Sequence, residues 1–290
     1  MKNEPVANLT KSTILQGDAF QVLSRLPSES IQCVVTSPPY WGLRDYEIEG
    51  QIGLEPTLDE FLERLVAIFS QVKRTLREDG TLWLNIGDGY TSGNRRWRAT
   101  DKKNPARAMD VRPDTPEGLK PKDLLGIPWK LAFALQQDGW YLRSDIVWYK
   151  PNAMPESVKD RPTRAHEYIF LLTKAEQYYY DYEVIVENNG SGRRNRRSVW
   201  SVNTQPFPEA HFATFPPGLI EPCILAGSKA GDWVLDPFFG SGTVGVVCQE
   251  HGRRYIGVEL RPEYIAIARR RLAKKNRTLL AIPESTCRVQ

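Results

Sequence analysis

The chain has 290 residues, of which 41% are hydrophobic and 26% charged, a composition typical of a globular protein with a sizeable core. It contains no run of about 18 apolar residues, and no apolar stretch follows Lys2, which argues against a membrane span and a secretory signal. The 4 cysteines lie far apart and the 3 histidines lack metal-ligand spacing, so we expect a cytoplasmic protein without a metal site or disulfide scaffold.

The net charge of +4 conceals an uneven distribution along the chain. Residues 95–122 contain nine basic and four acidic residues, residues 191–200 contain four arginines and no acid, and residues 262–277 contain six basic residues and one glutamate. The rest of the chain is therefore acidic. Basic charge gathered into segments of an acidic body suggests a polyanionic partner.

Strand-like and helix-like segments alternate along the chain. In chain order we expect a helix at 19–26, a strand at 31–36, a helix at 58–76, a strand at 81–86, a helix at 128–137, strands at 141–148 and 168–172, a helix at 219–226, a strand at 233–236, a helix ending near 251, a strand at 254–258 and a helix from 262. This alternation predicts an α/β fold with a mainly parallel sheet. Residues 91–122 and 187–213 are expected to be long basic loops.

A glycine-rich segment at 233–245 connects an expected strand to an expected helix and reads Trp-Val-Leu-Asp-Pro-Phe-Phe-Gly-Ser-Gly-Thr-Val-Gly. Its glycines match a dinucleotide-binding spacing, but only 31 residues follow Glu259, too few for the further βα units of such a fold. Asp236, at the end of the strand, would repel a pyrophosphate and suits a cationic ligand. S-adenosylmethionine offers an ammonium for Asp236 and ribose hydroxyls for Glu259.

A second motif, Val-Val-Thr-Ser-Pro-Pro-Tyr at 34–40, ends the first apolar strand. Its two prolines fix φ and hold Ser37 extended, so they create a rigid rim with the Ser37 hydroxyl and backbone carbonyls as acceptors. Two acceptors that take both N–H bonds of a nucleobase amino group would favour a pyramidal nitrogen, whose lone pair is free to attack a methyl group. Tyr40 would stack on the base.

The order of the two motifs, catalytic first and cofactor second, resembles the β class of bacterial and phage DNA amino-methyltransferases. Segments 17–18, 85–89, 148–152 and 210–216 are also similar to that family. The resemblance implies a Rossmann-like methyltransferase fold, a base flipped from duplex DNA, in-line methyl transfer to an amino nitrogen, no metal, and a homodimer. Because both motifs must meet at one methyl group, we expect one catalytic domain over residues 1–290.

Together the motifs and the resemblance assign specific residues. Catalysis is assigned to Ser37, Pro38, Pro39 and Tyr40. S-adenosylmethionine binding is assigned to Asp18, Thr36, Thr214, Phe215, Pro216, Asp236, Pro237, Phe238, Gly240, Ser241, Gly242, Thr243 and Glu259. The pair His166-Glu167 is expected to be structural.

Double-stranded DNA is the expected partner, and its recognition is assigned to the two basic loops. Segment 187–213 occupies the position where the family's target-recognition region lies, and arginine suits phosphates and guanine edges. The predicted DNA contacts are Arg95, Arg96, Arg98, Lys150, Arg193, Arg194, Arg196, Arg197 and Trp200.

Four interpretations remain open. The target is adenine N6, narrowly favoured by the similarity of segments 41–46 and 51–55 to solitary enzymes, or cytosine N4, which is commoner where serine precedes Pro-Pro-Tyr. A catalytically silent DNA-binding regulator is disfavoured by the intact motifs, and an RNA methyltransferase is disfavoured by the long basic loops.

Overall fold

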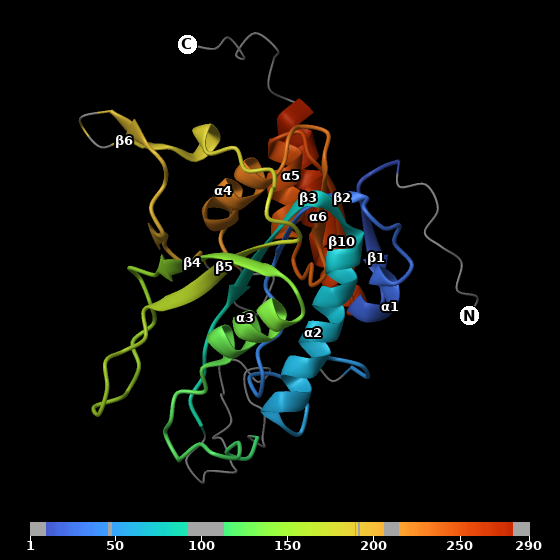
Figure 1. Ribbon diagram of the computed structural model, residues 1–290. Coiled ribbons are helices and arrows are strands. Elements are labelled where there is room, and N and C mark those ends of the chain that lie inside the picture. Colours follow the sequence, from blue (N-terminus) through green and yellow to red (C-terminus); the bar gives the residue numbers. More distant parts are fainter. Residues whose placement is uncertain are drawn as a thin grey trace.

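Strand β2 (Ile31–Thr36) and strand β9 (Trp233–Asp236) are buried along their whole length, as their apolar, β-branched sequences predict. They lie side by side in an eight-stranded sheet with the order β1-β10-β9-β2-β3-β5-β4-β8 (Figure 1). The computed structural model describes residues 10–45, 48–91, 113–188, 190, 192–205 and 215–280, with side chains up to 275.

The first five strands of this order are parallel, and β5 runs antiparallel to both β3 and β4. The remaining bounds are β1 Thr13–Gln16, β3 Leu76–Ile86, β4 Tyr141–Tyr149, β5 His166–Thr173, β8 Val199–Ser201 and β10 Arg254–Glu259. A separate pair joins β6 (Glu187–Asn188) to β7 (Arg193–Arg194). The predicted α/β fold with a mainly parallel sheet is thus confirmed.

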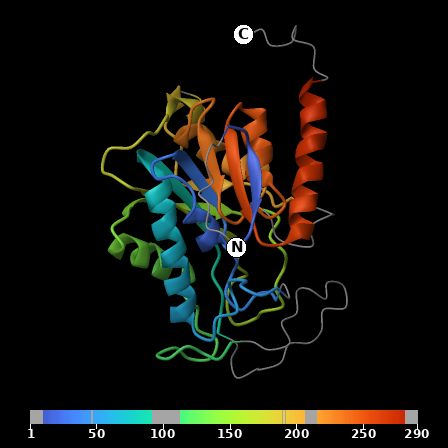
Figure 2. The same cartoon turned by 90° about the vertical axis from the view of Figure 1, so that its right-hand side faces the viewer.

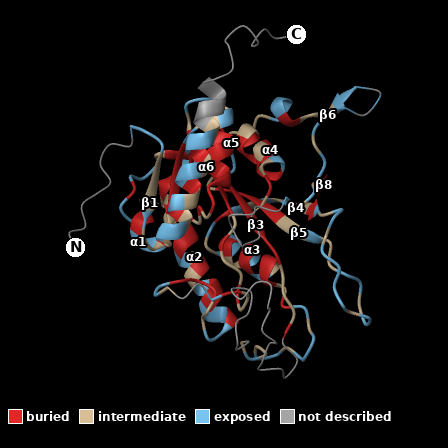
Figure 3. Cartoon of the chain, turned by 180° about the vertical axis from the view of Figure 1, so that it is seen from behind, coloured by how far each residue is buried: buried red, intermediate tan, exposed pale blue. Residues whose placement is uncertain are grey.

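Helices cover both faces of the sheet. Side chains of α1 (Ala19–Leu23), α2 (Leu58–Thr75) and α3 (Ile127–Gln137) belong to one core cluster, and those of α4 (Pro217–Gly227), α5 (Thr243–Glu250) and α6 (Pro262–Leu280) belong to the other. Figure 2 shows the sheet between α2 and α6. Figure 3 shows the burial concentrated in the strands and on the inner faces of the helices. A short 3-10 helix, Glu183–Ile185, precedes β6.

Helix α2 forms where the sequence predicts it, because every local signal agrees. The Thr57 hydroxyl caps the helix by accepting from the Glu60 N–H at 3.2 Å, and acidic residues occupy the first turn while Lys73 and Arg74 occupy the last. Its apolar stripe from Leu58 to Thr75 is buried. No helix of the described residues is long and apolar enough to cross a membrane.

The start of β3 and the presence of β1, β8 and the β6–β7 pair differ from the sequence-based expectation. Strand β3 starts at Leu76 rather than 81, because the chain leaves α2 in an extended conformation and Leu76 pairs with Ile31 before the register shifts. Strands β1 and β8, of 4 and 3 residues, were not expected. Both are too short for an alternating pattern to be recognised, and β8 adds part of segment 187–213 to the sheet.

Candidate active site

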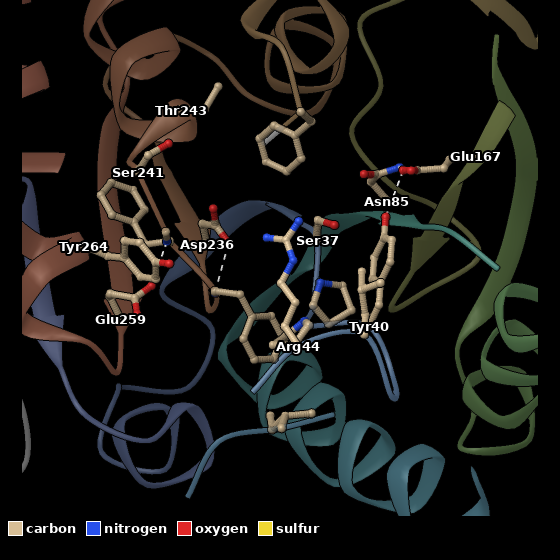
Figure 4. A pocket seen from close by; sticks show the side chains of 18 of the residues that line it. Ser37, Tyr40, Arg44, Asn85, Glu167, Asp236, Ser241, Thr243, Glu259 and Tyr264 are labelled. Atoms are coloured by element: carbon tan, nitrogen blue, oxygen red, sulfur yellow. Dashed lines mark hydrogen bonds between the residues drawn. The ribbon is translucent and has the colours of Figure 1, made fainter. Parts of the chain in front are cut away.

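A cavity of about 900 Å³ opens at the carboxyl-terminal edge of the parallel strands, where ligands bind in folds of this kind (Figure 4). The antiparallel pairing of β5 with β3 and β4 adds a second wall, because it brings the start of β5 beside the ends of β3 and β4. Figure 4 shows Asp236, Ser241, Glu259 and Tyr264 at one end of the cavity and Ser37, Tyr40, Asn85 and Glu167 at the other.

A hydrogen bond joins the two sequence motifs directly. Thr36, the last residue of β2, is fully buried, and its hydroxyl donates to Oδ1 of Asp236 at 2.7 Å across 200 residues of chain. The next residue, Ser37, lines the cavity together with Pro38 and Pro39. The contact fixes the rim formed by Ser37 relative to the end of β9.

Asp236 presents a buried carboxylate to the cavity. Its Oδ1 accepts from the Thr36 hydroxyl and from the Phe238 N–H at 3.0 Å, and the residue is 1% exposed. Burial raises the pKa of Asp236 from 3.8 to about 7, although both hydrogen bonds oppose the rise. Both of these hydrogen bonds come from neutral donors, and a buried carboxylate favours a cationic ligand group such as an ammonium.

Glu259 ends β10 and holds the glycine-rich loop. Its Oε2 accepts from the Gly240 N–H and its Oε1 accepts from the Arg261 N–H, both at 2.8 Å. Burial raises the pKa of Glu259 above its usual value, so hydroxyl donors of a ligand would stabilise its charged form. Both carboxylates of the cofactor prediction therefore lie at one end of the same cavity.

The Phe239 side chain packs against β10 and so anchors the glycine-rich loop. A Cβ on Gly257 of β10 would lie 2.2 Å from the Phe239 ring, so only glycine leaves room for this side chain. The Phe239 N–H also donates to the Val258 carbonyl at 2.8 Å. Gly240 and Gly242 then adopt φ of +48° and +81°, the left-handed region that favours glycine, and lead into α5.

We expect Gly257→Ala to destabilise the protein by about 1–3 kcal/mol, because the added methyl overpacks the Phe239 ring. The free energy of unfolding in urea measures the effect. Gly218→Ala is the matched control, because Gly218 lies in α4 with nothing within 4 Å of an added Cβ and should be neutral or slightly stabilising. Equal stability of the two variants would contradict the packing argument.

Tyr40 is held by a polar cluster at the far end of the cavity. Its hydroxyl donates to Oε2 of Glu167 at 2.8 Å, and the Asn85 amide donates to the same oxygen at 3.3 Å. Lys150, directly after β4, donates to Oε1 of Glu167. Burial and Glu167 raise the pKa of Tyr40 well above its usual value, so Tyr40 stays protonated.

Most predicted catalytic and cofactor residues line this one cavity. They are Asp18, Ser37, Pro38, Pro39, Tyr40, Phe215, Asp236, Phe238, Gly240, Ser241, Thr243 and Glu259. Thr36, Pro216, Pro237 and Gly242 do not line it; Thr36 orients Asp236, and Gly242 precedes α5. Thr214 lies outside the described residues.

Asp18 has a local structural role besides its place in the cavity. Its Oδ1 accepts from the Gln21 N–H at 3.0 Å and so caps α1, while Oδ2 lies 3.9 Å from Arg64. Arg271 of α6 donates to the Thr243 hydroxyl at 2.9 Å, so part of the basic α6 surface supports the loop.

Seven of the nine predicted DNA contacts fall into three groups, and Arg196 lies against the ninth, Trp200. Arg95, Arg96 and Arg98 lie outside the described residues. Arg193 and Arg197 are exposed near Glu183 and Glu187, and Arg194 also lies near Glu187. Lys150 lines the cavity and pairs with Glu167.

Trp200 requires a correction, because the structure places it in the core. It is 3% exposed in β8, its indole N–H donates to the Arg197 carbonyl at 2.7 Å, and Arg196 covers its ring at 4.6 Å. A buried indole cannot stack on a nucleobase, and we interpret Trp200 as the support of the Arg196 side chain.

Sequence reasoning missed Asn85 as an individual residue and treated Glu167 as structural. Both belong to antiparallel neighbours, β3 and β5, whose pairing a sequence pattern cannot reveal. The sequence offers one indication of the role of Glu167, because it is a charged residue at the start of the otherwise apolar strand β5. No group of three or more His, Cys, Asp or Glu suited to a metal occurs in the part of the chain that the structure describes.

Comparisons with known proteins agree with this geometry. A family model described as DNA methylase, N6_N4_Mtase, matches residues 31–270. The Type II methyltransferase M.Cfr9I of Citrobacter freundii is 68% identical over 282 residues, which cover 97% of this chain and 94% of that protein. The PvuII DNA methyltransferase, which is cytosine-N4-specific, has a similar fold, with a TM-score of 0.68, 21% identity and 96% coverage of both chains.

A protein from Thermus thermophilus was solved in complex with S-adenosyl-L-methionine and is described as a putative DNA modification methylase. It has a TM-score of 0.64 to this chain at 26% identity, and the match covers 91% of this chain and 94% of that one.

Proposed function

This chain belongs to the N6/N4 family of DNA methylases, and on that premise we propose that its cavity methylates the exocyclic amino nitrogen of a base flipped out of duplex DNA. The protein is an S-adenosylmethionine-dependent Type II DNA methyltransferase. Flipping is part of the proposal because the amino nitrogen is inaccessible inside the base stack. A cytoplasmic location follows from the proposed substrate, and a homodimer stays a prediction.

The observation that carries the proposal is the Thr36–Asp236 hydrogen bond of 2.7 Å. It fixes the rim assigned to the amino group beside the carboxylate assigned to the cofactor. Methyl transfer needs donor and acceptor in near contact and in line, and placing the two assigned sites at the ends of adjacent strands would favour this arrangement. The single catalytic domain, with segments 91–122 and 187–213 as its basic DNA-binding parts, belongs to the same proposal.

The cofactor fits the chemistry of the Asp236 end. A buried carboxylate, Asp236, and a partly buried one, Glu259, both with raised pKa values, favour a ligand that brings an ammonium and hydroxyl donors, which S-adenosylmethionine does. When bound, it supplies a methyl group already activated by a sulfonium. Asp236 would hold the ammonium, Glu259 the ribose hydroxyls, and the Gly240 turn would let the backbone approach closely.

At the other end of the cavity, acceptor groups of the protein would bind the target amino group and activate its nitrogen for attack. The Ser37 hydroxyl and the Pro38 carbonyl would accept the two N–H bonds, which favours a pyramidal nitrogen with its lone pair toward the methyl group. The Tyr40 ring would stack on the base, and its hydrogen bond to Glu167 fixes the ring. Pro38 and Pro39 restrict φ and keep this rim rigid.

We propose cytosine N4 as the acceptor in place of adenine N6, which the sequence narrowly favours, and keep adenine N6 as the second candidate. Ser37 before Pro-Pro-Tyr favours cytosine. The similarity that favours adenine is to solitary enzymes, whereas M.Cfr9I, at 68% identity, is named a Type II methyltransferase.

Expression in a methylation-free host followed by single-molecule sequencing tests the function and the target base together. The expected result is N4-methylcytosine at one recurring motif. N6-methyladenine there would select the second candidate, and methylation of RNA alone would overturn the proposal.

The arginines around β7 are proposed to contact DNA phosphates. Replacing Arg193, Arg194, Arg196 and Arg197 with alanine should weaken DNA binding and flatten its salt dependence. Each lost phosphate contact lowers the slope of log K against log salt by about 0.9. The measurement is fluorescence anisotropy over a salt series.

Alanine at Arg269, Arg270 and Lys274, all exposed on α6, is the control and should leave the slope unchanged. An unchanged slope in the β7 variant would move recognition to segment 91–122.

A further inference from the structure

Glu167 places a carboxylate inside the cavity, where three donors meet it. These are the Tyr40 hydroxyl at 2.8 Å, the Asn85 amide at 3.3 Å and the Lys150 ammonium. They come from three separate segments: the turn after β2, the end of β3 and the residue after β4. The side chains of Glu167 and Lys150 are 14% and 17% exposed.

Removing a carboxylate from water, as for the largely buried Glu167 side chain, costs free energy unless the charge is paired. Lys150 supplies a compensating positive charge, and the Glu167 oxygens accept the hydrogen bonds of all three donors. Arg164, which precedes β5, is engaged elsewhere: it donates to the Asp88 carbonyl and lies over the Tyr90 ring. The Asp88 carboxylate accepts from the Gly126 and Ile127 N–H groups.

The hydroxyl groups of Ser37 and Tyr40 donate in the same direction, toward the Glu167 carboxylate. Tyr40 donates its proton to the hydrogen bond with Glu167, so its oxygen can accept a hydrogen bond from the neighbouring Ser37 side chain (Figure 4). Hydrogen bonding from the Ser37 side chain lowers the pKa of Tyr40, while burial and Glu167 raise it more strongly. Ser37, Tyr40 and Glu167 thus form a series whose donors point toward the carboxylate.

The methyl transfer requires such a path, because an amino nitrogen that gains a methyl group must lose a proton. We propose that Glu167 is a positioning residue that orients the Tyr40 hydroxyl and receives, through Tyr40 and Ser37, the proton that the amino nitrogen releases. This inference rests on the proposed function.

The step balances as a shift of three protons along the series. The N–C bond to the methyl group forms as the S–C bond breaks, and the sulfur keeps the electron pair of that bond. The amino N–H proton passes to Ser37 Oγ, the Ser37 proton passes to Tyr40 Oη, and the Tyr40 proton passes to Glu167 Oε2. Glu167 changes from carboxylate to carboxylic acid and later releases the proton to solvent. Tyr40 takes one proton as it gives one, so it never exists as a phenolate.

The test is the single-turnover rate of methyl transfer from tritiated S-adenosylmethionine to DNA, measured against pH with both substrates saturating. Wild type should lose rate at low pH, because the path ends on a carboxylate that must be free to accept a proton. Glu167→Gln, which keeps an oxygen for the Tyr40 hydrogen bond, should be about 100-fold slower and lack this low-pH limb. Its affinities for S-adenosylmethionine and DNA should be unchanged.

Tyr40→Phe keeps the aromatic ring and should lose a similar factor. The double variant should be no slower than either single variant, because both changes break one path. Glu221→Gln is the matched control, since Glu221 pairs with His251 outside the cavity lining and should behave as wild type.

A wild-type rate in Glu167→Gln, a retained low-pH limb, or a loss confined to DNA affinity would overturn the path. Should that variant not fold, an unchanged rate in Tyr40→Phe would overturn it equally. A wild-type protein that methylates no DNA would instead refute the proposed function.

Discussion

Ser37→Ala is expected to slow methyl transfer by at least about 100-fold while the affinity for S-adenosylmethionine stays within a factor of two. The hydroxyl is proposed to accept one N–H bond of the target amino group, and alanine offers no acceptor there. The remaining acceptor, the Pro38 carbonyl, cannot hold both N–H bonds, so the nitrogen lone pair stays delocalised into the base. Single-turnover transfer to DNA gives the rate, and calorimetry gives the cofactor affinity.

Ser30→Ala is a suitable control for this experiment. Ser30 precedes β2 at its opposite end, and its hydroxyl donates to the Pro27 carbonyl at 2.8 Å outside the cavity lining. The control should transfer methyl groups at the wild-type rate. If Ser37→Ala kept most of its activity, the acceptor role of that hydroxyl would be wrong.

Asp236→Asn should weaken S-adenosylmethionine binding by roughly 10- to 150-fold, the range given by about 1.5–3 kcal/mol for a hydrogen bond to a charged group. Asparagine keeps an oxygen for Thr36 and the Phe238 N–H but has no charge for an ammonium. Calorimetric titration measures the dissociation constant. Asp160→Asn, an exposed change outside the cavity lining, is the control and should bind as wild type.

The raised pKa of Asp236 also predicts that Asp236→Asn changes the stability of the protein. This change is favourable, whereas the change in cofactor affinity is unfavourable. Burial raises this pKa from 3.8 to about 7, so the folded protein without cofactor binds a proton that the unfolded chain has released. Its stability therefore falls as the pH rises from about 4 to about 7. Asparagine removes this dependence, and we expect the cofactor-free variant to be more stable than wild type at pH 8.

Cofactor binding has the reverse dependence, because an ammonium prefers the ionised carboxylate. The dissociation constant of wild type should fall as the pH rises toward 7 and then level off, with no such change in Asp236→Asn. Identical pH profiles of the two proteins, measured by calorimetry, would exclude Asp236 as the ammonium site.

The sequence predicted the parts of this enzyme that depend on contiguous residues. The apolar strands β2 and β9, each followed by a proline-containing motif, place Ser37 and Asp236 at the same sheet edge, because parallel strands end together. The amphipathic pattern and capping of α2 were equally readable.

The parts that the sequence did not reveal depend on pairing between distant segments. Glu167 joins the site only because β5 runs antiparallel to β3 and β4, and no local pattern determines that direction. Gly257 matters only because Phe239 folds back over β10. The burial of Trp200 follows from the short strand β8, whose three residues carry no recognisable period.

If one cavity joins the cofactor to a base amino nitrogen, the methylated nucleoside must carry its new methyl group on that nitrogen. The purified protein is incubated with tritiated S-adenosylmethionine and DNA from a methylation-free host, and the digested nucleosides are identified by mass spectrometry. We expect label in N4-methylcytosine, or in N6-methyladenine for the second candidate, and none with Ser37→Ala. Label in a ring-carbon methylated base, or an equal yield from Ser37→Ala, would contradict it.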